Sequence, residues 1–165
     1  MSDTANGQVP SNEAESAALI VNAQYLRDLS FENPRAPESL LQQAEQQPEV
    51  SVEVEVRARQ LNEETFESVL NLKVETRTGS DIVFMVEVDY GGIVTIRNAT
   101  QELTAALVLI ETPRLLFPFA RAIIADAIRE GGFPPLLINP IDFAELQRRK
   151  AMAAANGDHP APANA

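Results

Sequence analysis

Apolar and charged positions alternate over much of the first two thirds of the chain. Valines occupy every second position over 50–56, and the residues between them are Ser51, Glu53 and Glu55. A period of two predicts strands with one buried and one solvated face. The same period recurs over 66–75 and 82–90. With turn residues between these runs and a short strand at 93–97 after two glycines, the pattern predicts four strands in an antiparallel meander.

The segment 25–37, with the sequence YLRDLSFENPRAP, predicts a short edge strand ahead of this meander. Its apolar side chains alternate with charged ones until prolines stop any regular element. Asp28 and Glu32 are then exposed carboxylates on the edge of the sheet.

Farther along the chain, apolar residues recur at three and four positions over 116–128, which predicts an amphipathic helix. Gly131 and Gly132 end it. Pro118 cannot donate a backbone hydrogen bond, so the helix either begins near Phe117 or is kinked. A short helix over 101–110 precedes it.

A last helix is predicted from Asp142, which forms a variant capping box with Glu145. Strands followed by helices predict an α+β fold, in which a four-stranded antiparallel sheet has helices packed on one face. Small and polar composition predicts disordered tails at 1–23 and 151–165, which leaves one folded domain at 24–150.

Composition limits the possible functions. The chain has 165 residues and 45% hydrophobic content, enough for one globular domain. A net charge of -11 opposes binding to nucleic acid or anionic lipid. With no cysteine and a single histidine, His159, in the predicted tail, we expect no enzyme activity of the nucleophile-and-base kind and no cofactor. The N-terminus lacks the pattern of a secretory signal, so a cytoplasmic protein is expected.

Two pairs of carboxylates could serve acid-base chemistry or bind calcium. Glu63 and Glu64 are interpreted as residues of a solvated turn. Glu87 and Asp89 share a strand face with Met85, which gives a mixed acidic and apolar surface. Such a surface fits a basic partner, and the alternative is an ordinary exposed sheet face.

Four segments have an order and spacing that match one known family. They are YLRDLSFENPRAP at 25–37, DYGGI at 89–93, LFPFAR at 116–121 and FPPLLINPIDF at 133–143. Through them the chain resembles the SecB family of bacterial protein-export chaperones. The resemblance implies a holdase that binds unfolded secretory preproteins and delivers them to the motor SecA. It also implies a homotetramer built as a dimer of dimers.

The resemblance implies three sets of site residues, each with a plainer alternative. Residues matching the SecA-binding face, which are otherwise a solvated surface, are Asp28, Glu32, Met85 and Glu87. Residues matching the tetramer interface, which are otherwise intrachain core, are Val86, Val88 and Tyr90. Residues expected to line a client groove, which are otherwise core, are Leu40, Leu41, Val52, Val54, Phe133, Leu136, Phe143 and Leu146.

Two other functions remain open at this point. One is a SecB-like chaperone that serves a single client in a toxin-antitoxin system. The other is an oligomeric small-molecule-binding protein or carboxylate-dependent enzyme, with a pocket between helix and sheet and with Glu87 and Asp89 as its polar groups.

Overall fold

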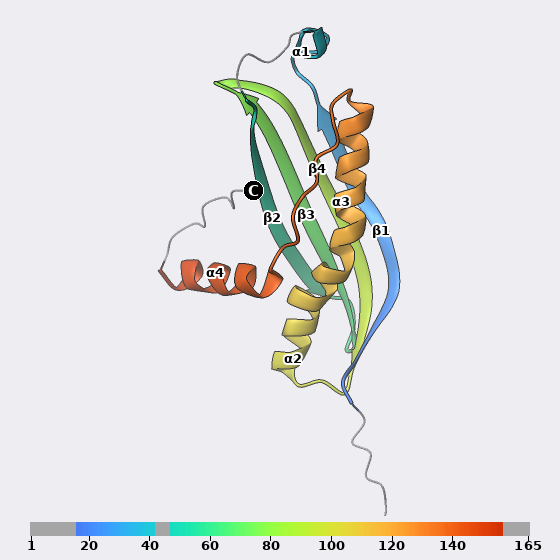
Figure 1. Ribbon diagram of the computed structural model, residues 1–165. Coiled ribbons are helices and arrows are strands. Elements are labelled where there is room, and N and C mark those ends of the chain that lie inside the picture. Colours follow the sequence, from blue (N-terminus) through green and yellow to red (C-terminus); the bar gives the residue numbers. More distant parts are fainter. Residues whose placement is uncertain (1–15, 42–46, 157–165) are drawn as a thin grey trace, which may run out of the picture.

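Four antiparallel strands form one sheet in the order β1-β4-β3-β2. The computed structural model describes residues 16–41 and 47–156, shown in Figure 1. The strands are β1 (Ala18–Glu32), β2 (Glu49–Gln60), β3 (Thr65–Thr78) and β4 (Asp81–Arg97). The helical elements are α1 (Glu38–Leu41), α2 (Gln101–Ala106), η1 (Leu107–Glu111), α3 (Thr112–Glu130) and α4 (Phe143–Asn156). The predicted α+β fold, with helices on one face of a four-stranded sheet, is confirmed.

The core lies between the sheet and α3, which runs along one face of the strands (Figure 1). We call this the helix face, and the opposite face of the sheet the open face. Leu70, Leu72 and Val74 of β3 are fully buried on the helix face, against Ile124 and Ile128 of α3. The predicted strand with one buried face is therefore confirmed, because every second residue of β3 faces the helix while its neighbours face away.

Strand β4 is longer than predicted. Gly91 and Gly92 do not break it, and the predicted short strand at 93–97 is its continuation. Each glycine leaves room for a side chain that crosses close to the backbone. A Cβ at Gly91 would lie 2.6 Å from the Tyr25 ring, and one at Gly92 would lie 3.0 Å from Leu116. The glycines thus permit close packing on the two faces and do not mark a turn.

Strand β1 also starts earlier than predicted. It begins at Ala18 rather than near Tyr25, so residues 18–23 belong to the sheet and not to a tail. The cause is the continuous β4, since residues Ala18 to Val21 pair with Val94 to Arg97. The rest of the predicted N-terminal tail, residues 1–15, lies outside the described residues.

The two predicted middle helices form one continuous helical segment with a π-helical turn, η1, between α2 and α3. Pro118 lies inside α3 and does not begin it. The π turn precedes Pro113, which has no N–H for the carbonyl of Leu109. Gln147 of α4 donates to that carbonyl from 3.4 Å. By length and composition the whole segment could span a bilayer, yet its apolar stripe packs on the sheet.

Helix α4 runs crosswise to α3 (Figure 1). Asp142 Oδ1 accepts a hydrogen bond from the Glu145 backbone N–H at 2.9 Å, as the predicted cap requires. The helix continues to Asn156, six residues beyond the predicted end of the domain. Alanine has the highest helix propensity, so the alanine-rich composition interpreted as a tail extends the helix instead. Residues 157–165 lie outside the described part of the chain.

Candidate functional site

The four residues of the expected SecA-binding face lie together on the open face. Strands β1 and β4 are neighbours, and their register pairs Glu32 with Met85 and Ser30 with Glu87. Asp28 pairs with Asp89 one step farther. Paired residues of antiparallel strands point to the same face of a sheet. The result is an acidic surface, defined here as Asp28, Glu32, Met85 and Glu87, with the β1 carboxylates exposed and the β4 residues half-buried.

A hydrogen-bonded cluster holds the β4 carboxylates of this surface. The side-chain amide of Asn71 on β3 donates to Glu87 Oε1 and to Asp89 Oδ1, each at 2.8 Å. Arg57 Nη2 on β2 lies 2.7 Å from both carboxylate oxygens of Asp89. We call these four residues the Asn71 cluster. Asp89 is therefore paired with a cation, whereas Glu87 receives a neutral donor.

A second carboxylate cluster lies farther along the open face. Glu67 of β3 is 6% exposed and accepts hydrogen bonds from Tyr25 of β1 and Arg59 of β2. Arg27 Nη1 lies 3.7 Å from Glu67 Oε1. We call these residues, with Gly91 beneath the Tyr25 ring, the Glu67 cluster. It ties both edge strands to the middle of the sheet.

The pKa values within the Glu67 cluster follow from these contacts. The hydrogen bond from Arg59, and then that from Tyr25, lowers the pKa of Glu67 below its ordinary value, although burial acts in the opposite direction. Burial, followed by the hydrogen bond to Glu67, raises the pKa of Tyr25. The hydrogen bond to Glu67 also raises the pKa of Arg59. The cluster thus favours an ionised Glu67, a neutral Tyr25 and a charged Arg59.

Two of the three residues expected at the tetramer interface are in the core of the single chain. Val86 and Val88 face α3 and are fully buried. Helix α3 already covers these β4 positions, so the plainer alternative, intrachain core, describes the two valines in the single chain, and their role in a tetramer stays a prediction. Tyr90 is only partly buried, and its ring stacks on Phe119 with centroids 6.0 Å apart.

The sequence reasoning missed an exposed apolar strip beside Tyr90. Leu26 and Leu29 of β1 are 47% and 41% exposed, and Leu115 and Phe119 of α3 are 46% and 49% exposed. Leu26 pairs with Tyr90 across β1 and β4, which makes the strip continuous from strand to helix. The leucines at 26 and 29 were visible as apolar positions, but nothing local showed that α3 leaves them uncovered.

The residues expected to line a client groove differ widely in exposure. Val52 and Phe143 are 4% and 1% exposed, so the plainer alternative, core, describes these two. Leu40 and Leu41 are 47% and 80% exposed. The half-buried members, which pack against the core with one side, are Val54, Phe133, Leu136 and Leu146.

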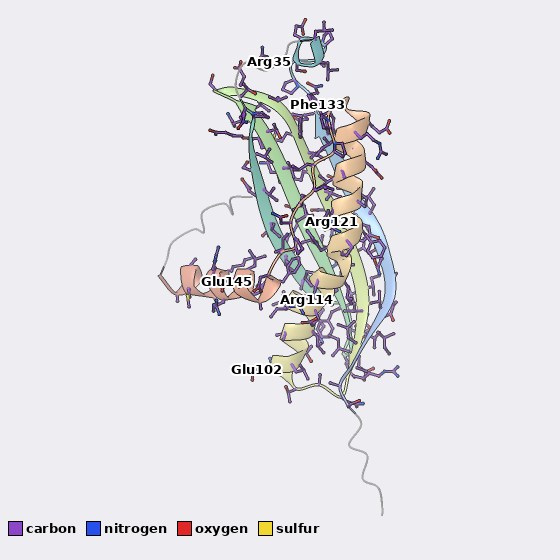
Figure 2. The ribbon with its side chains drawn as sticks, in the orientation of Figure 1. Arg35, Glu102, Arg114, Arg121, Phe133 and Glu145 are labelled. Carbon is purple, nitrogen blue, oxygen red and sulfur yellow. The ribbon has the colours of Figure 1, made fainter. Side chains whose placement is uncertain are left out.

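Part of this apolar surface gathers at the end of the sheet where α1 lies. Phe133 is found at this end (Figure 2), with its ring 4.8 Å from that of Phe84. Leu40 packs against Gly132, where a Cβ would lie 3.1 Å away. Leu137, in the extended segment between α3 and α4, is 82% exposed and was missed.

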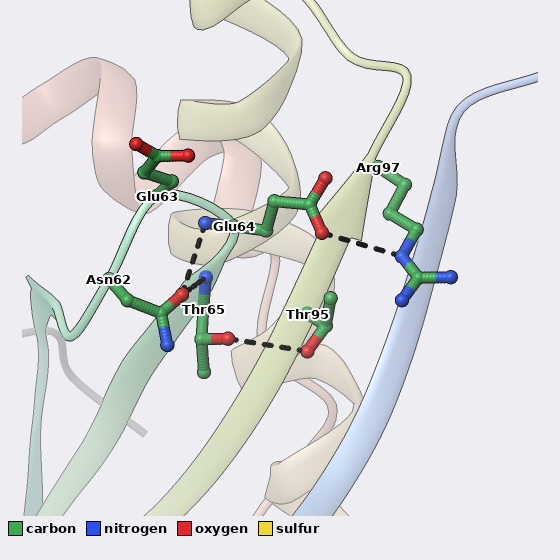
Figure 3. Close-up of a pocket in the computed structure, with 6 residues that line it drawn as sticks. All are labelled: Asn62, Glu63, Glu64, Thr65, Thr95 and Arg97. Carbon is green, nitrogen blue, oxygen red and sulfur yellow. Dashed lines mark hydrogen bonds and ion pairs between the residues drawn. The ribbon is translucent and has the colours of Figure 1, made fainter.

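A shallow hollow of about 440 Å³ lies at the β2–β3 turn (Figure 3). Asn62 Oδ1 accepts from the backbone N–H groups of Glu64 and Thr65, and Glu64 pairs with Arg97 at 3.4 Å. These contacts build a turn and offer no acid-base pair. Glu87 and Asp89, expected in a pocket between helix and sheet, lie on the open face. Within the described residues, no three potential ligands converge on a metal site.

Comparison with known proteins gives a consistent assignment. The family model described as "Preprotein translocase subunit SecB" matches residues 12–154. The chain is 46% identical to the protein-export protein SecB of Rhodospirillum centenum, over 89% of this chain and 88% of that protein. It is 46% identical to that of Rhodopseudomonas palustris, over 94% and 98% of the two chains.

Among solved structures, the chain is similar to a SecB-like chaperone of Mycobacterium tuberculosis in complex with a peptide from an antitoxin. The TM-score is 0.62 at 15% identity, over 74% of this chain and 90% of that chain, which is a likeness of fold. Sequence identity and family match together extend across the sheet, α3 and α4. The chain therefore belongs to the SecB family.

Proposed function

We propose that this protein is a chaperone of protein export that holds unfolded preproteins and delivers them to SecA. Membership in the SecB family carries this proposal, and it makes the protein a chaperone and not an enzyme. A holdase that binds unfolded chains but not native ones delays folding by mass action, without needing a nucleotide.

The apolar surface near α1 is the proposed client site. Leu41 and Leu137 are among the most exposed apolar side chains described, and the half-buried Phe133, Leu136 and Leu146 extend the surface toward α4. An unfolded preprotein offers apolar side chains in no fixed order, so broad apolar contact suits it better than a shaped pocket. The described residues support this role for Leu40 and Leu41, and not for the buried Val52 and Phe143.

The acidic surface is the proposed dock for SecA. SecB proteins receive the zinc-containing C-terminal segment of SecA on a face of this kind, and carboxylates around Met85 fit a basic segment. Pairing of β1 with β4 supports the proposal, because it gathers Asp28, Glu32, Met85 and Glu87 on one side of the sheet.

A homotetramer assembled as a dimer of dimers is also proposed. The exposed strip of Leu26, Leu29, Leu115 and Phe119 beside Tyr90 is an apolar surface of the kind that oligomers cover. We place the protein in the cytoplasm, where preproteins await export.

Light scattering on a sizing column tests the chaperone proposal. The protein is run alone, with a secretory precursor diluted from denaturant, and with the same precursor already folded. We expect a mass near four chains that increases only with the unfolded precursor. Absence of a complex with every unfolded precursor would overturn the proposal, and a complex with one partner alone would favour the single-client alternative.

A pair of variants locates the client site. Leu41→Ser removes an exposed apolar side chain near α1, while Leu61→Ser removes one that is 42% exposed at the β2–β3 turn. Weaker precursor binding is expected for the first variant alone, by about two- to fivefold, the cost of a partly buried leucine. Equal effects of the two variants would contradict a client site at α1.

A further inference from the structure

The Asn71 cluster contains a neutral donor between two carboxylates of the open face. Asparagine has one amide nitrogen with two hydrogens, and here each hydrogen is directed to a different carboxylate. The opposite orientation of the amide would bring its carbonyl oxygen against Glu87 and Asp89, which is repulsive. The orientation of Asn71 is therefore fixed by the charges on both sides.

The two carboxylates differ in what remains available to a partner. Asp89 has a side chain only 16% exposed, and Arg57 contacts both of its oxygens. Its charge is largely compensated. In the described part of the chain no lysine or arginine forms an ion pair with Glu87. Lys73 lies opposite it on β3 without forming an ion pair, so the charge of Glu87, beside Met85, is less compensated than that of Asp89.

A glutamate on an exposed strand face has several rotamers, and fixing one on binding costs conformational entropy. A hydrogen bond made before binding reduces that cost. A neutral donor does so without cancelling the charge, whereas an arginine or lysine at position 71 would cancel it. The Asn71 amide combines these two properties.

We propose that Asn71 is a positioning residue that fixes the Glu87 carboxylate for docking of the SecA C-terminal segment. The second Asn71 hydrogen is donated to Asp89, the carboxylate that Arg57 compensates. The inference rests on the docking role proposed above for the acidic surface, and it adds a β3 residue that contacts no partner itself.

A double-mutant cycle tests this role, with affinity for SecA and for its zinc-loaded C-terminal segment measured by calorimetry. We expect Asn71→Ala to weaken binding by about three- to tenfold, the range for losing an ordinary intramolecular hydrogen bond, since the Glu87 charge itself remains. Glu87→Gln should weaken it at least as much. In the Glu87→Gln background, Asn71→Ala should have no further effect, because Asn71 acts through Glu87.

Two further variants separate positioning from folding. Asn71→Leu keeps the branched shape and removes the donor, so it should reproduce Asn71→Ala. Asn22→Ala removes an asparagine whose amide donates to Thr95 Oγ1 at 2.7 Å, away from the acidic surface, and should bind SecA normally. Thermal midpoints at equal protein concentration show whether each variant remains folded.

The possible outcomes separate the positioning role of Asn71 from the docking role of the acidic surface. Normal binding by Asn71→Ala and Asn71→Leu, with weak binding by Glu87→Gln, would overturn the positioning role alone. A loss from Asn71→Ala that persists in the Glu87→Gln background would also overturn it. Normal binding by Glu87→Gln would overturn the proposed docking surface, and the role of Asn71 with it.

Discussion

The Glu67 cluster and the Asn71 cluster lie on the same face of the same sheet, yet they surround their carboxylates differently. Glu67 is 6% exposed and has Arg59, Arg27 and the Tyr25 hydroxyl around it. Glu87 is half-buried and has the Asn71 amide. The charge of Glu67 is compensated by close cations, whereas Glu87, with Lys73 opposite it but in no ion pair, is compensated less.

This difference indicates what each cluster does. Glu67 connects β3 to Tyr25 on one edge strand and to Arg59 on the other, so its contacts stabilise the sheet. Glu87 is held but not neutralised, so its charge is available to a basic partner. The number and charge of the neighbours, more than exposure alone, separate a structural carboxylate from a binding one.

The largest effect is expected from Gly91→Val. The substitution fills the space next to Gly91 in which the Tyr25 ring lies as it crosses β4 to reach Glu67. A Cβ there would lie within 2.6 Å of the Tyr25 ring, and a branched one would displace the ring. We expect unfolding in urea to show a loss of about 1–3 kcal/mol, typical of overpacking. In a Tyr25→Ala background the same substitution should cost much less. A full cost in that background would show that the ring is not the obstacle.

Glu67→Gln should have the next largest effect on stability. The amide keeps the size of the side chain but leaves Arg59 without its anionic partner and weakens the acceptor for Tyr25. Because both arginines are largely exposed, we expect a loss of only about 1–2 kcal/mol. Glu64→Gln is the matched control, since the Glu64–Arg97 pair is exposed on both sides. Equal losses for the two variants would contradict a special role of Glu67.

These two predictions rest on contacts that the sequence could not supply. Period two placed Glu67, Glu87 and Asn71 on one side of their strands, because parity along a strand is local. Which of them meet across strands depends on register, and the pairing of Tyr25 with Gly91, which carries Tyr25 to Glu67, joins positions 66 apart. The family resemblance predicted the acidic surface, but it did not predict that Asn71 of β3 donates a hydrogen bond to Glu87.

The same limit explains the errors in the fold. Val86 and Val88 were correctly expected to share a face, but whether that face meets another copy or α3 depends on a helix 30 residues away. The glycines at 91 and 92 were interpreted as a break, since a glycine that makes room for a remote side chain has the same local signature as one in a turn. The same error made the predicted β1 too short, because its first residues pair with the part of β4 that follows the glycines.

Acid should reduce the difference between the wild type and Glu67→Gln. The folded-state pKa of Glu67 is lowered, so its contribution is complete above the ordinary value of 4.5 and is lost as pH falls through the folded-state value. We expect the two proteins to differ in unfolding free energy at pH 7 and to converge below pH 4.5. A difference that stays constant into that range would show that ionisation of Glu67 is not responsible. Urea titrations at a series of pH values measure this.

The smallest effect is expected from Arg57→Met, which removes the cation from the Asn71 cluster and keeps much of the side-chain length. Asp89 would then resemble Glu87, held by Asn71 and uncompensated. For a basic SecA segment we expect binding about two- to threefold tighter at low ionic strength, with the gain lost at high salt. Calorimetry at two salt concentrations measures this, and Arg114→Met, which removes the partner of Glu111 on the helical segment away from the acidic surface, is the control. Weaker binding by a folded Arg57→Met would instead mean that Arg57 orients Asp89 for the partner, and the distinction between compensated and available carboxylates would then fail within the Asn71 cluster itself.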